Sequence, residues 1–210
     1  MKSHTVEKIG GTSMSDYAAV RDNIIFHKQA QKEGYQRIFV VSAYGGVTDL
    51  LLEHKKSDKT GVYSSFAGAE DGSVWRQKIA QLRAKLFAIN EELFEDTPLC
   101  QRANAFIGER LDETEQTLND LERVCEHGHF ALNDHLITVR EMLASLGEAH
   151  SAWNMAELLK RDGINTVFVD LTGWNAEKHL LLDARIENAF KDIDLATCLP
   201  IATGYAHCTE

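Results

Sequence analysis

The sequence predicts an α/β protein with a mostly parallel sheet, and three observations lead to this fold class. Short apolar runs alternate along the chain with longer segments of helical periodicity. Two of the short runs end directly in glycine-rich loops, Gly10–Ser13 and Ser42–Thr48. A third short apolar run, near the end of the chain, is followed directly by Gly204. Strands that alternate with helices in this way indicate a parallel sheet.

The first part of the chain predicts two strands, each followed by a glycine loop. Residues 4–9 form the first strand, and the β-branched and aromatic residues 37–41 form the second. A helix between them is expected to end at Gly34. Its apolar positions have helical spacing and are Tyr17, Val20, Ile24 and Ala30.

The middle of the chain predicts a helical insertion over about residues 71–135. Residues 57–73 are rich in Ser, Gly and Asp, and we expect a surface loop there. Apolar residues then recur every three or four positions from Trp75 to Leu93, and again after Pro98. Two long amphipathic helices follow from this spacing.

The last part of the chain predicts a helix, a strand, a shorter helix and a final strand. The helical pattern that starts at His135 is interrupted at Gly147–Glu148 and ends at Arg161–Gly163. Strands are expected over residues 166–169 and 199–203, with a helix around 183–191 between them.

Composition excludes several classes of function. A chain of 210 residues with 44% hydrophobic residues can bury a sizeable core. The net charge of -10 argues against nucleic-acid and anionic membrane surfaces, which require clustered Lys and Arg. No apolar run approaches the roughly 20 residues of a membrane span, and no signal pattern opens the chain, so we expect a cytoplasmic protein.

Cysteine and histidine spacing does not suggest a metal centre. The four cysteines contain no C-x-x-C pair, which argues against structural zinc or a redox dithiol and favours reduced thiols. Among the nine histidines, His127 and His129 flank a glycine in a turn-like sequence, and His150 and His207 have no second ligand at helical spacing. We therefore predict no metal site.

The first glycine loop has the features of an anion site. Lys8 stands near the end of a strand, and Gly10–Ser13 exposes consecutive backbone N–H groups where a helix begins. Unpaired amides and the helix dipole both favour a phosphate there. The loop matches neither the dinucleotide fingerprint nor a Walker loop. A tight turn with a solvated lysine explains the same residues equally well.

The second loop, Ser42–Thr48, follows another strand, and open α/β sheets bind ligands beyond the carboxyl ends of their strands. The hydroxyls of Ser42 and Thr48 could hold a carboxylate or a phosphate. The alternative is a Gly-Gly turn after which Thr48–Asp49 caps the next helix.

Glu148 is the third candidate, because it lies in an otherwise apolar helical segment beside the small residues Ala149 and Ala152. A buried carboxylate needs a partner, so Glu148 either binds a cationic group of a ligand or forms a structural ion pair. The residues alone favour neither alternative.

These three segments, in this order, resemble the aspartokinase branch of the amino-acid kinase family. The opening Lys8–Ser13 is similar to the family's Lys-Phe-Gly-Gly-Thr-Ser, and Ser42–Thr48 to its Ser-Ala-Met-Gly-Gly-Val-Thr. Gly147–Glu148 with Ser151–Ala152 is similar to its third motif. Ile9 and Tyr44 replace the usual Phe and Met but remain apolar. These variants resemble the aspartokinases associated with ectoine synthesis in salt-tolerant bacteria.

The resemblance implies a three-layer α/β/α fold and transfer of the γ-phosphate of ATP, with Mg²⁺, to the β-carboxylate of L-aspartate. It implies that Lys8 neutralises charge on the phosphoryl group in flight. The phosphate-binding residues would be Gly10, Gly11, Thr12 and Ser13. The aspartate-binding residues would be Ser42, Gly45, Gly46, Thr48 and Glu148.

The resemblance covers residues 1–210 as the amino-terminal, substrate-binding part of the kinase domain. The family's Gly-Arg-Gly-Gly-Ser-Asp segment would follow Gly204, but the chain ends at Glu210. We therefore expect an incomplete fold that lacks the ATP-binding half and the regulatory domains, is inactive alone, and forms a homo-oligomer through its uncovered surfaces. The alternatives are another member of the superfamily, or a binding or scaffold domain without catalysis.

Overall fold

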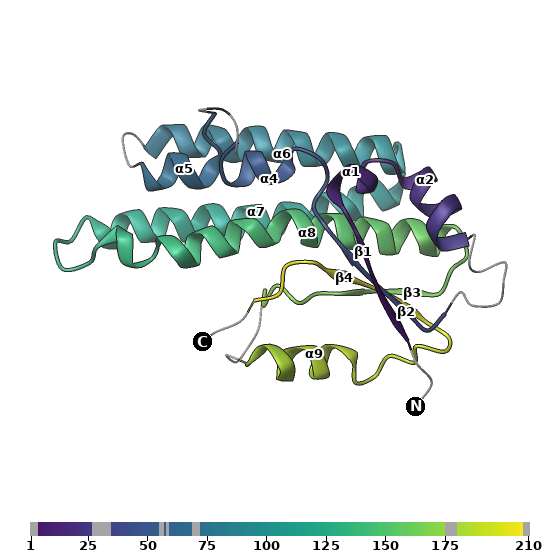
Figure 1. The fold of residues 1–210 in the computed structure, drawn as a ribbon. Helices are drawn as coiled ribbons and strands as arrows, with labels where there is room; N and C mark the ends of the chain where they lie inside the picture. The colour runs from purple at the N-terminus through teal and green to yellow at the C-terminus, as the bar shows by residue number, and fades with distance from the viewer. Residues whose placement is uncertain are drawn as a thin grey trace. The chain divides into compact units, whose positions relative to one another are not determined.

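A computed structural model describes residues 4–26, 35–54, 57, 59–68, 72–174 and 180–207. The chain divides into two compact units. The first unit comprises residues 1–45 and 148–210 and contains the sheet, and the second comprises residues 46–147 and is helical. Figure 1 shows the elements in chain order.

The sheet of the first unit has four parallel strands in the order β1-β2-β4-β3. The mostly parallel α/β fold predicted from the sequence is therefore confirmed. The strands are β1 (Thr5–Ile9), β2 (Arg37–Val41), β3 (Thr166–Val169) and β4 (Leu199–Thr203).

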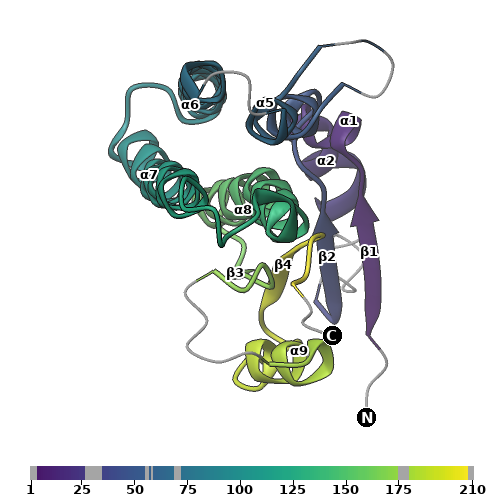
Figure 2. The same cartoon turned by 90° about the vertical axis from the view of Figure 1, so that its left-hand side faces the viewer.

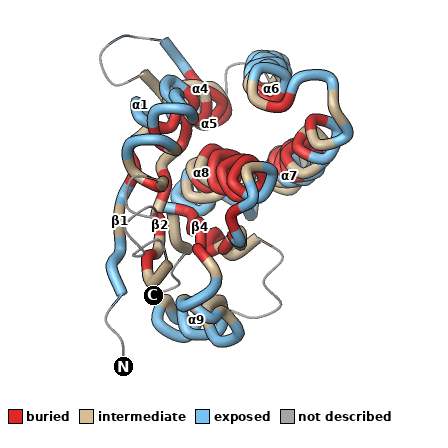
Figure 3. Tube along the Cα trace, turned by 90° about the vertical axis from the view of Figure 1, so that its right-hand side faces the viewer, coloured by how far each residue is buried: buried red, intermediate tan, exposed pale blue. Residues whose placement is uncertain are grey.

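The register places three strand ends side by side. Ile9 is the partner of Val41, and Val41 is the partner of Thr203. Because the strands are parallel, the loops that follow these residues leave the sheet at the same edge. β1 is the exposed edge strand, coloured mostly pale blue in Figure 3, whereas all five residues of β4 are buried.

Helices cover both faces of this sheet. The part of α8 (Leu136–Arg161) that belongs to the first unit lies on one face, and α9 (Leu182–Phe190) lies on the other (Figure 2). On the α8 side, Thr166 Oγ1 donates to the carbonyl oxygen of Ala156 at 2.8 Å. On the α9 side, Phe190 packs against a small apolar cluster that contains Val169 and Ala202.

The predicted interruption of α8 is wrong, because the helix continues through Gly147 and Glu148. A glycine inside a helix costs only about 1 kcal/mol relative to alanine, which the packing of a long helix readily offsets. The predicted end is confirmed. Gly163, with a φ of +84°, follows the helix, and its N–H donates to the carbonyl oxygen of Lys160 at 3.0 Å.

Short helical segments follow β1. They are α1 (Gly11–Met14), α2 (Tyr17–Val20) and a π-helical turn (Arg21–Ile25). The side chain of Asp16 caps α2 by accepting the Ala19 N–H at 2.9 Å. The predicted positions Ala30 and Gly34 lie outside the described residues.

The second unit is built around two long helices, α6 (Gly72–Phe94) and α7 (Pro98–Cys125), which pack side by side (Figure 1). Both predicted helices are therefore confirmed. Thr97 caps α7 by accepting the Cys100 N–H, and Pro98 occupies the first turn, where its missing N–H costs nothing. A hydrogen bond of 2.8 Å joins the side chains of Asn90 and Asn104 across the pair.

The remaining elements of the second unit are α4 (Val47–Leu51), α5 (Val62–Ala67) and a 3₁₀ turn (Leu132–Asp134). The predicted surface loop over 57–73 is wrong where α5 forms. Val62 and Phe66 are buried, and the Ser64 hydroxyl accepts the Gly61 N–H at 3.0 Å. The polar composition of this stretch masks the two buried residues, Val62 and Phe66, and the hydrogen bond of Ser64 at the start of the helix. No helix among the described residues could cross a membrane.

Candidate functional site

The two glycine loops that follow β1 and β2 touch each other. Gly11, the first residue of α1, lies against the carbonyl oxygen of Ala43, and a Cβ atom on Gly11 would come within 2.6 Å of that oxygen. No side chain can be accommodated at that separation without movement of backbone. The sequence therefore needs glycine at this position to bring the loops together.

A serine links the same two loops. The backbone N–H of Gly45 donates to Ser15 Oγ at 3.2 Å, and Ser15 Oγ donates to the carbonyl oxygen of Gly11 at 3.2 Å. Sequence reasoning missed Ser15 as a member of the site, since its position before a helix suggested only a helix start.

Lys8 lies in β1, in register with Val40 of β2, and is exposed. The turn after it is short, because the carbonyl oxygen of Gly10 accepts the Met14 N–H and closes α1. Thr12 and Ser13 are exposed on this helical turn. The cation and the small hydroxyl residues thus occupy the edge at which the sequence placed them.

Glu148 has a partly buried carboxylate on α8. Burial raises the pKa of this carboxyl, while a hydrogen bond from the Tyr205 backbone and the positive charge of Lys8 act in the opposite direction. The oxygen Oε2 is buried without a hydrogen-bond partner among the described residues. A desolvated carboxylate of this kind favours a cationic group beside it.

Two further contacts tie Glu148 and Ser42 to the same edge. The Glu148 carboxylate lies against Gly204, which follows β4. One turn further along α8, Ser151 Oγ donates to the carbonyl oxygen of Ser42 at 2.8 Å. In the sequence, Ser151 is only part of a motif, and the structure adds its hydrogen bond to the second loop.

The structure therefore brings together most of the predicted residues at one edge of the first unit. Gly46 and Thr48 belong to the second unit. Gly46, with a φ of +79°, precedes α4, and Thr48 is exposed in its first turn. The predicted cap by Thr48–Asp49 is wrong, because the helix begins one residue earlier and Gly46 occupies the cap position.

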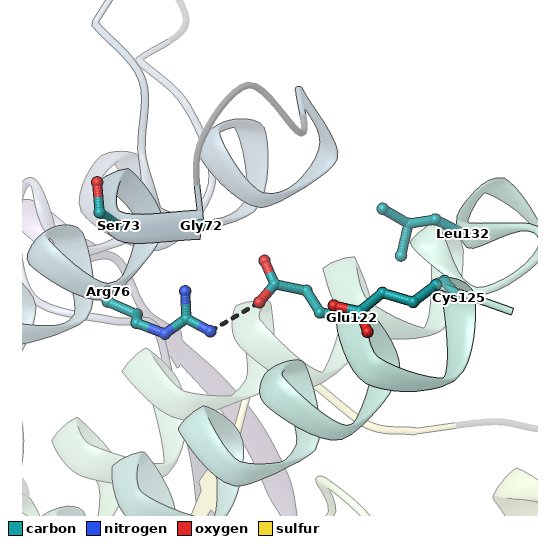
Figure 4. Close-up of a pocket in the computed structure, with 7 residues that line it drawn as sticks. Gly72, Ser73, Arg76, Glu122, Cys125 and Leu132 are labelled. Atoms are coloured by element: carbon teal, nitrogen blue, oxygen red, sulfur yellow. Dashed lines mark hydrogen bonds and ion pairs between the residues drawn. The ribbon is translucent and has the colours of Figure 1, made fainter.

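The second unit has a hollow of its own, of about 750 Å³, between the start of α6 and the end of α7 (Figure 4). Two of its charged side chains, Arg76 and Glu122, are paired with each other. Arg76 contacts Glu122 at 2.7 Å, and Trp75 Nε1 donates to the same carboxylate at 2.6 Å. These contacts join the two helices.

The described residues hold no group of three or more His, Cys, Asp or Glu side chains that could bind a metal ion. Cys100, Cys125 and Cys198 are free thiols in this part of the chain.

Comparison with known proteins gives a consistent result. The model of the amino acid kinase family matches residues 4–210. The chain is 48% identical over 207 residues to aspartate kinase Ask_Ect of Stutzerimonas stutzeri (strain A1501). That match covers 99% of this chain and 44% of the relative, so the chain spans less than half of the relative's length.

Two solved structures share the fold. Escherichia coli aspartokinase III in complex with aspartate and ADP, in the R-state, matches with a TM-score of 0.54 and 21% identity over 96% of this chain and 40% of that chain. The T-state of the same enzyme, in complex with lysine and aspartate, has a TM-score of 0.54 and 22% identity over 95% of this chain and 40% of that one.

Proposed function

This chain belongs to the amino acid kinase family, and from that premise we propose that it forms the aspartate-binding part of an aspartokinase. The proposed reaction transfers the γ-phosphoryl group of ATP, taken as its Mg²⁺ complex, to the β-carboxylate of L-aspartate. A carboxylate oxygen forms the new bond to phosphorus, the bond to the leaving ADP breaks, and 4-phospho-L-aspartate results. The 48% identity to an aspartate kinase supports this substrate.

The observation that carries the proposal is the pair of opposite charges at one sheet edge. Lys8 is the second-last residue of β1, and its positive charge opposes the rise in the pKa of Glu148 that burial on α8 causes. Aspartate and ATP together bring carboxylates, phosphates and one ammonium group. A site with one cation for the phosphates and one carboxylate for the ammonium group matches that set of charges.

The first loop would bind the transferred phosphoryl group. Lys8 would neutralise its negative charge, and the amides of Gly10 and Gly11 would donate to its oxygens. Thr12 and Ser13, exposed on the same turn, would line the pocket. This assignment is supported by the absence of a side chain at Gly11, which keeps the turn close to the second loop.

The second loop and α8 would bind aspartate. Ser42 would contact its polar groups, and Gly45 would let the backbone approach it. The roles of Gly46 and Thr48 in aspartate binding stay predictions from the family motif. Glu148 would pair with its ammonium group, for which the buried and unpartnered Oε2 is a suitable acceptor. A ligand with no hydrogen-bond donor at that point would leave the oxygen unsatisfied.

The chain spans 44% of the length of the aspartate kinase that it matches. We therefore propose phosphoryl transfer for a protein of the relative's length, and aspartate binding without catalysis for residues 1–210. The amino-terminal, substrate-binding character of these residues, a role in aspartate-family amino-acid or ectoine biosynthesis, and the cytoplasmic location remain predictions. Self-association is also a prediction, supported by the exposed edge strand β1, where Val6 is 63% exposed.

Isothermal titration of the purified chain with L-aspartate tests the proposal. We expect saturable binding that Glu148→Gln weakens by at least about tenfold, because a charge-assisted hydrogen bond is lost. Glu187→Gln removes an exposed carboxylate of α9 in the same unit and serves as the matched control. Binding that Glu148→Gln leaves unchanged, or equal affinity for L-glutamate, would contradict the aspartate assignment.

A second titration addresses Lys8. With inorganic phosphate as the ligand, Lys8→Met should abolish binding at the sheet edge, whereas Lys191→Met, at an exposed lysine of the same unit, should not. Aspartate affinity should change less in Lys8→Met than in Glu148→Gln. The reverse order of effects would show that the two charges have the opposite roles.

A further inference from the structure

Three buried polar side chains meet behind the second glycine loop. Tyr44 is only 6% exposed, and His150 and Asn154 of α8 are fully buried. His150 and Asn154 are four residues apart in the helix, so both side chains point to the same side. Tyr44 stands where the related motif has an apolar Met, and its side chain contacts the polar residues His150 and Asn154.

The contacts among the three residues are specific. The rings of Tyr44 and His150 pack edge to face, with centroids 5.5 Å apart and planes inclined by 70°. Asn154 Nδ2 lies 3.1 Å from His150 Nε2, and the Asn154 side chain is hydrogen-bonded to the Tyr44 hydroxyl. The Asn154 side chain therefore contacts both the His150 ring and the Tyr44 hydroxyl.

None of the three groups is charged near neutral pH. Burial lowers the pKa of His150 to about 3 and raises the pKa of Tyr44 above its usual range. The set is therefore unsuited to proton transfer at neutral pH. Burying polar groups is unfavourable unless they are hydrogen-bonded, so the two contacts of Asn154 favour this orientation of Tyr44, although His150 Nδ1 and Asn154 Oδ1 are buried without a hydrogen-bond partner among the described residues.

The two peptide groups that flank Tyr44 face the first glycine loop. On one side, the carbonyl oxygen of Ala43 lies against Gly11. On the other side, the N–H of Gly45 donates to Ser15 Oγ. The position of the Tyr44 Cα atom thus sets both contacts, and the side chain of Tyr44 anchors that Cα atom to α8.

We propose that Tyr44 is a positioning residue, which His150 and Asn154 hold against α8 so that its two flanking peptides keep the second loop in contact with the first. The proposal has two parts. The mechanical part is that Tyr44 keeps the two loops in contact, and it does not depend on the proposed function. The substrate consequence is that aspartate affinity depends on Tyr44 although its side chain faces the helix, and this part rests on the proposed function.

Amide hydrogen exchange of the purified chain, measured by NMR, tests the mechanical part. Tyr44→Phe keeps the ring and removes the hydroxyl, and Asn154→Leu removes the amide from the helix side. Loss of one hydrogen bond between neutral groups should speed exchange at the Gly45 amide by about 3- to 10-fold in each variant. The Gly204 amide, bonded to the carbonyl oxygen of Val41 at the same edge, should be unaffected.

Thr166→Val is the matched control for a purely structural effect. It removes another buried hydroxyl that is bonded to α8, at the carbonyl oxygen of Ala156 and away from the loop. We expect it to lower the melting temperature without a selective change at Gly45. The proposal is overturned if Tyr44→Phe leaves Gly45 exchange unchanged, or if Thr166→Val changes it as much.

Titration with L-aspartate tests the substrate consequence. Tyr44→Phe should weaken binding by about 3- to 10-fold at a temperature well below its melting point, while Thr166→Val should keep the wild-type affinity. If the wild-type chain binds no aspartate, the proposed function fails while the exchange experiment still decides the role of Tyr44. If exchange changes but affinity does not, the loop contact is structural and the positioning role in binding is refuted.

Discussion

The carboxylate of Glu148 lies over Gly204 so closely that a Cβ atom on Gly204 would lie 3.1 Å from Oε2 and 3.2 Å from Oε1. The same added atom would lie 2.9 Å from the carbonyl oxygen of Val41, to which Gly204 donates its N–H. The carboxylate thus occupies the space that a side chain at Gly204 would fill.

Gly204→Ala should therefore destabilise the protein. Both neighbours of the new methyl group are polar and one is backbone, so we expect the free energy of unfolding in urea to fall by about 1–3 kcal/mol. Gly128→Ala is the control, because nothing lies within 4 Å of its added Cβ, and it should change stability by less than about 0.5 kcal/mol. Equal effects of the two substitutions would show that the edge relaxes freely.

Glu148→Gln should stabilise the protein at neutral pH while it weakens aspartate binding. Burial raises the pKa of Glu148 from 4.5, so the folded state holds the proton more tightly than the unfolded state. The stability from this group is present below pH 4.5 and is lost as the pH rises through the folded pKa. The melting temperature of the variant should exceed that of the wild type at pH 7, with a gap that closes towards pH 4. A gap independent of pH would contradict this reasoning.

Gly11→Ala and Gly10→Ala should differ sharply although they are neighbours. An added Cβ on Gly11 would meet the carbonyl oxygen of Ala43 at 2.6 Å, whereas one on Gly10 would meet nothing within 4 Å. We expect Gly11→Ala to cost about 1–3 kcal/mol in urea unfolding and Gly10→Ala less than about 1 kcal/mol. Similar losses would indicate that the glycines serve backbone conformation and not the contact between loops.

His150 should make the protein sensitive to acid. Its pKa is about 3 in the folded state against 6.5 for an exposed histidine, so the unfolded state binds a proton between these values. The stability from His150 is present above pH 6.5 and is lost as the pH falls towards 3, by up to about 1.4 kcal/mol per pH unit. Urea unfolding at pH 7, 6 and 5 should show a steeper loss for the wild type than for His150→Gln. Parallel curves would assign the acid loss to other groups.

The parallel sheet and its glycine loops could be predicted because both signals are local. Residues 37–41 are a continuous apolar run, and Ser42–Thr48 follows directly. The continuity of α8 could not be predicted, because the cost of Gly147 is smaller than the packing energy of the helix, which spacing does not reveal. Helix α5 could not be predicted either, because its two buried residues stand in a polar stretch and only their packing shows that they are buried.

The sequence predicts the charged residues and the glycines of the candidate site, but not the side chains that hold its loops in place. Lys8 and Glu148 follow from their local sequence and from the family motifs, whereas Ser15 and the group of Tyr44, His150 and Asn154 depend on contacts between residues far apart in the sequence. Spacing in the sequence tests His150 only as a metal ligand and does not single out its partner Asn154. The one available signal was the pair His150 and Asn154 at helical spacing beside an apolar segment, which indicates a buried polar contact but not its partner.

Because Ile9, Val41 and Thr203 share one register, the two ends of the sheet should differ in how well they tolerate insertions. Hydrogen bonds between neighbouring strands keep these three residues in register. A loop that precedes a strand, at its amino end, can therefore change in length without moving them. The exposed junction between Lys191 and Asp192, before β4, is such a place. A fluorescent label or a fused domain inserted there would leave the opposite edge, with Lys8 and Glu148, in its native geometry.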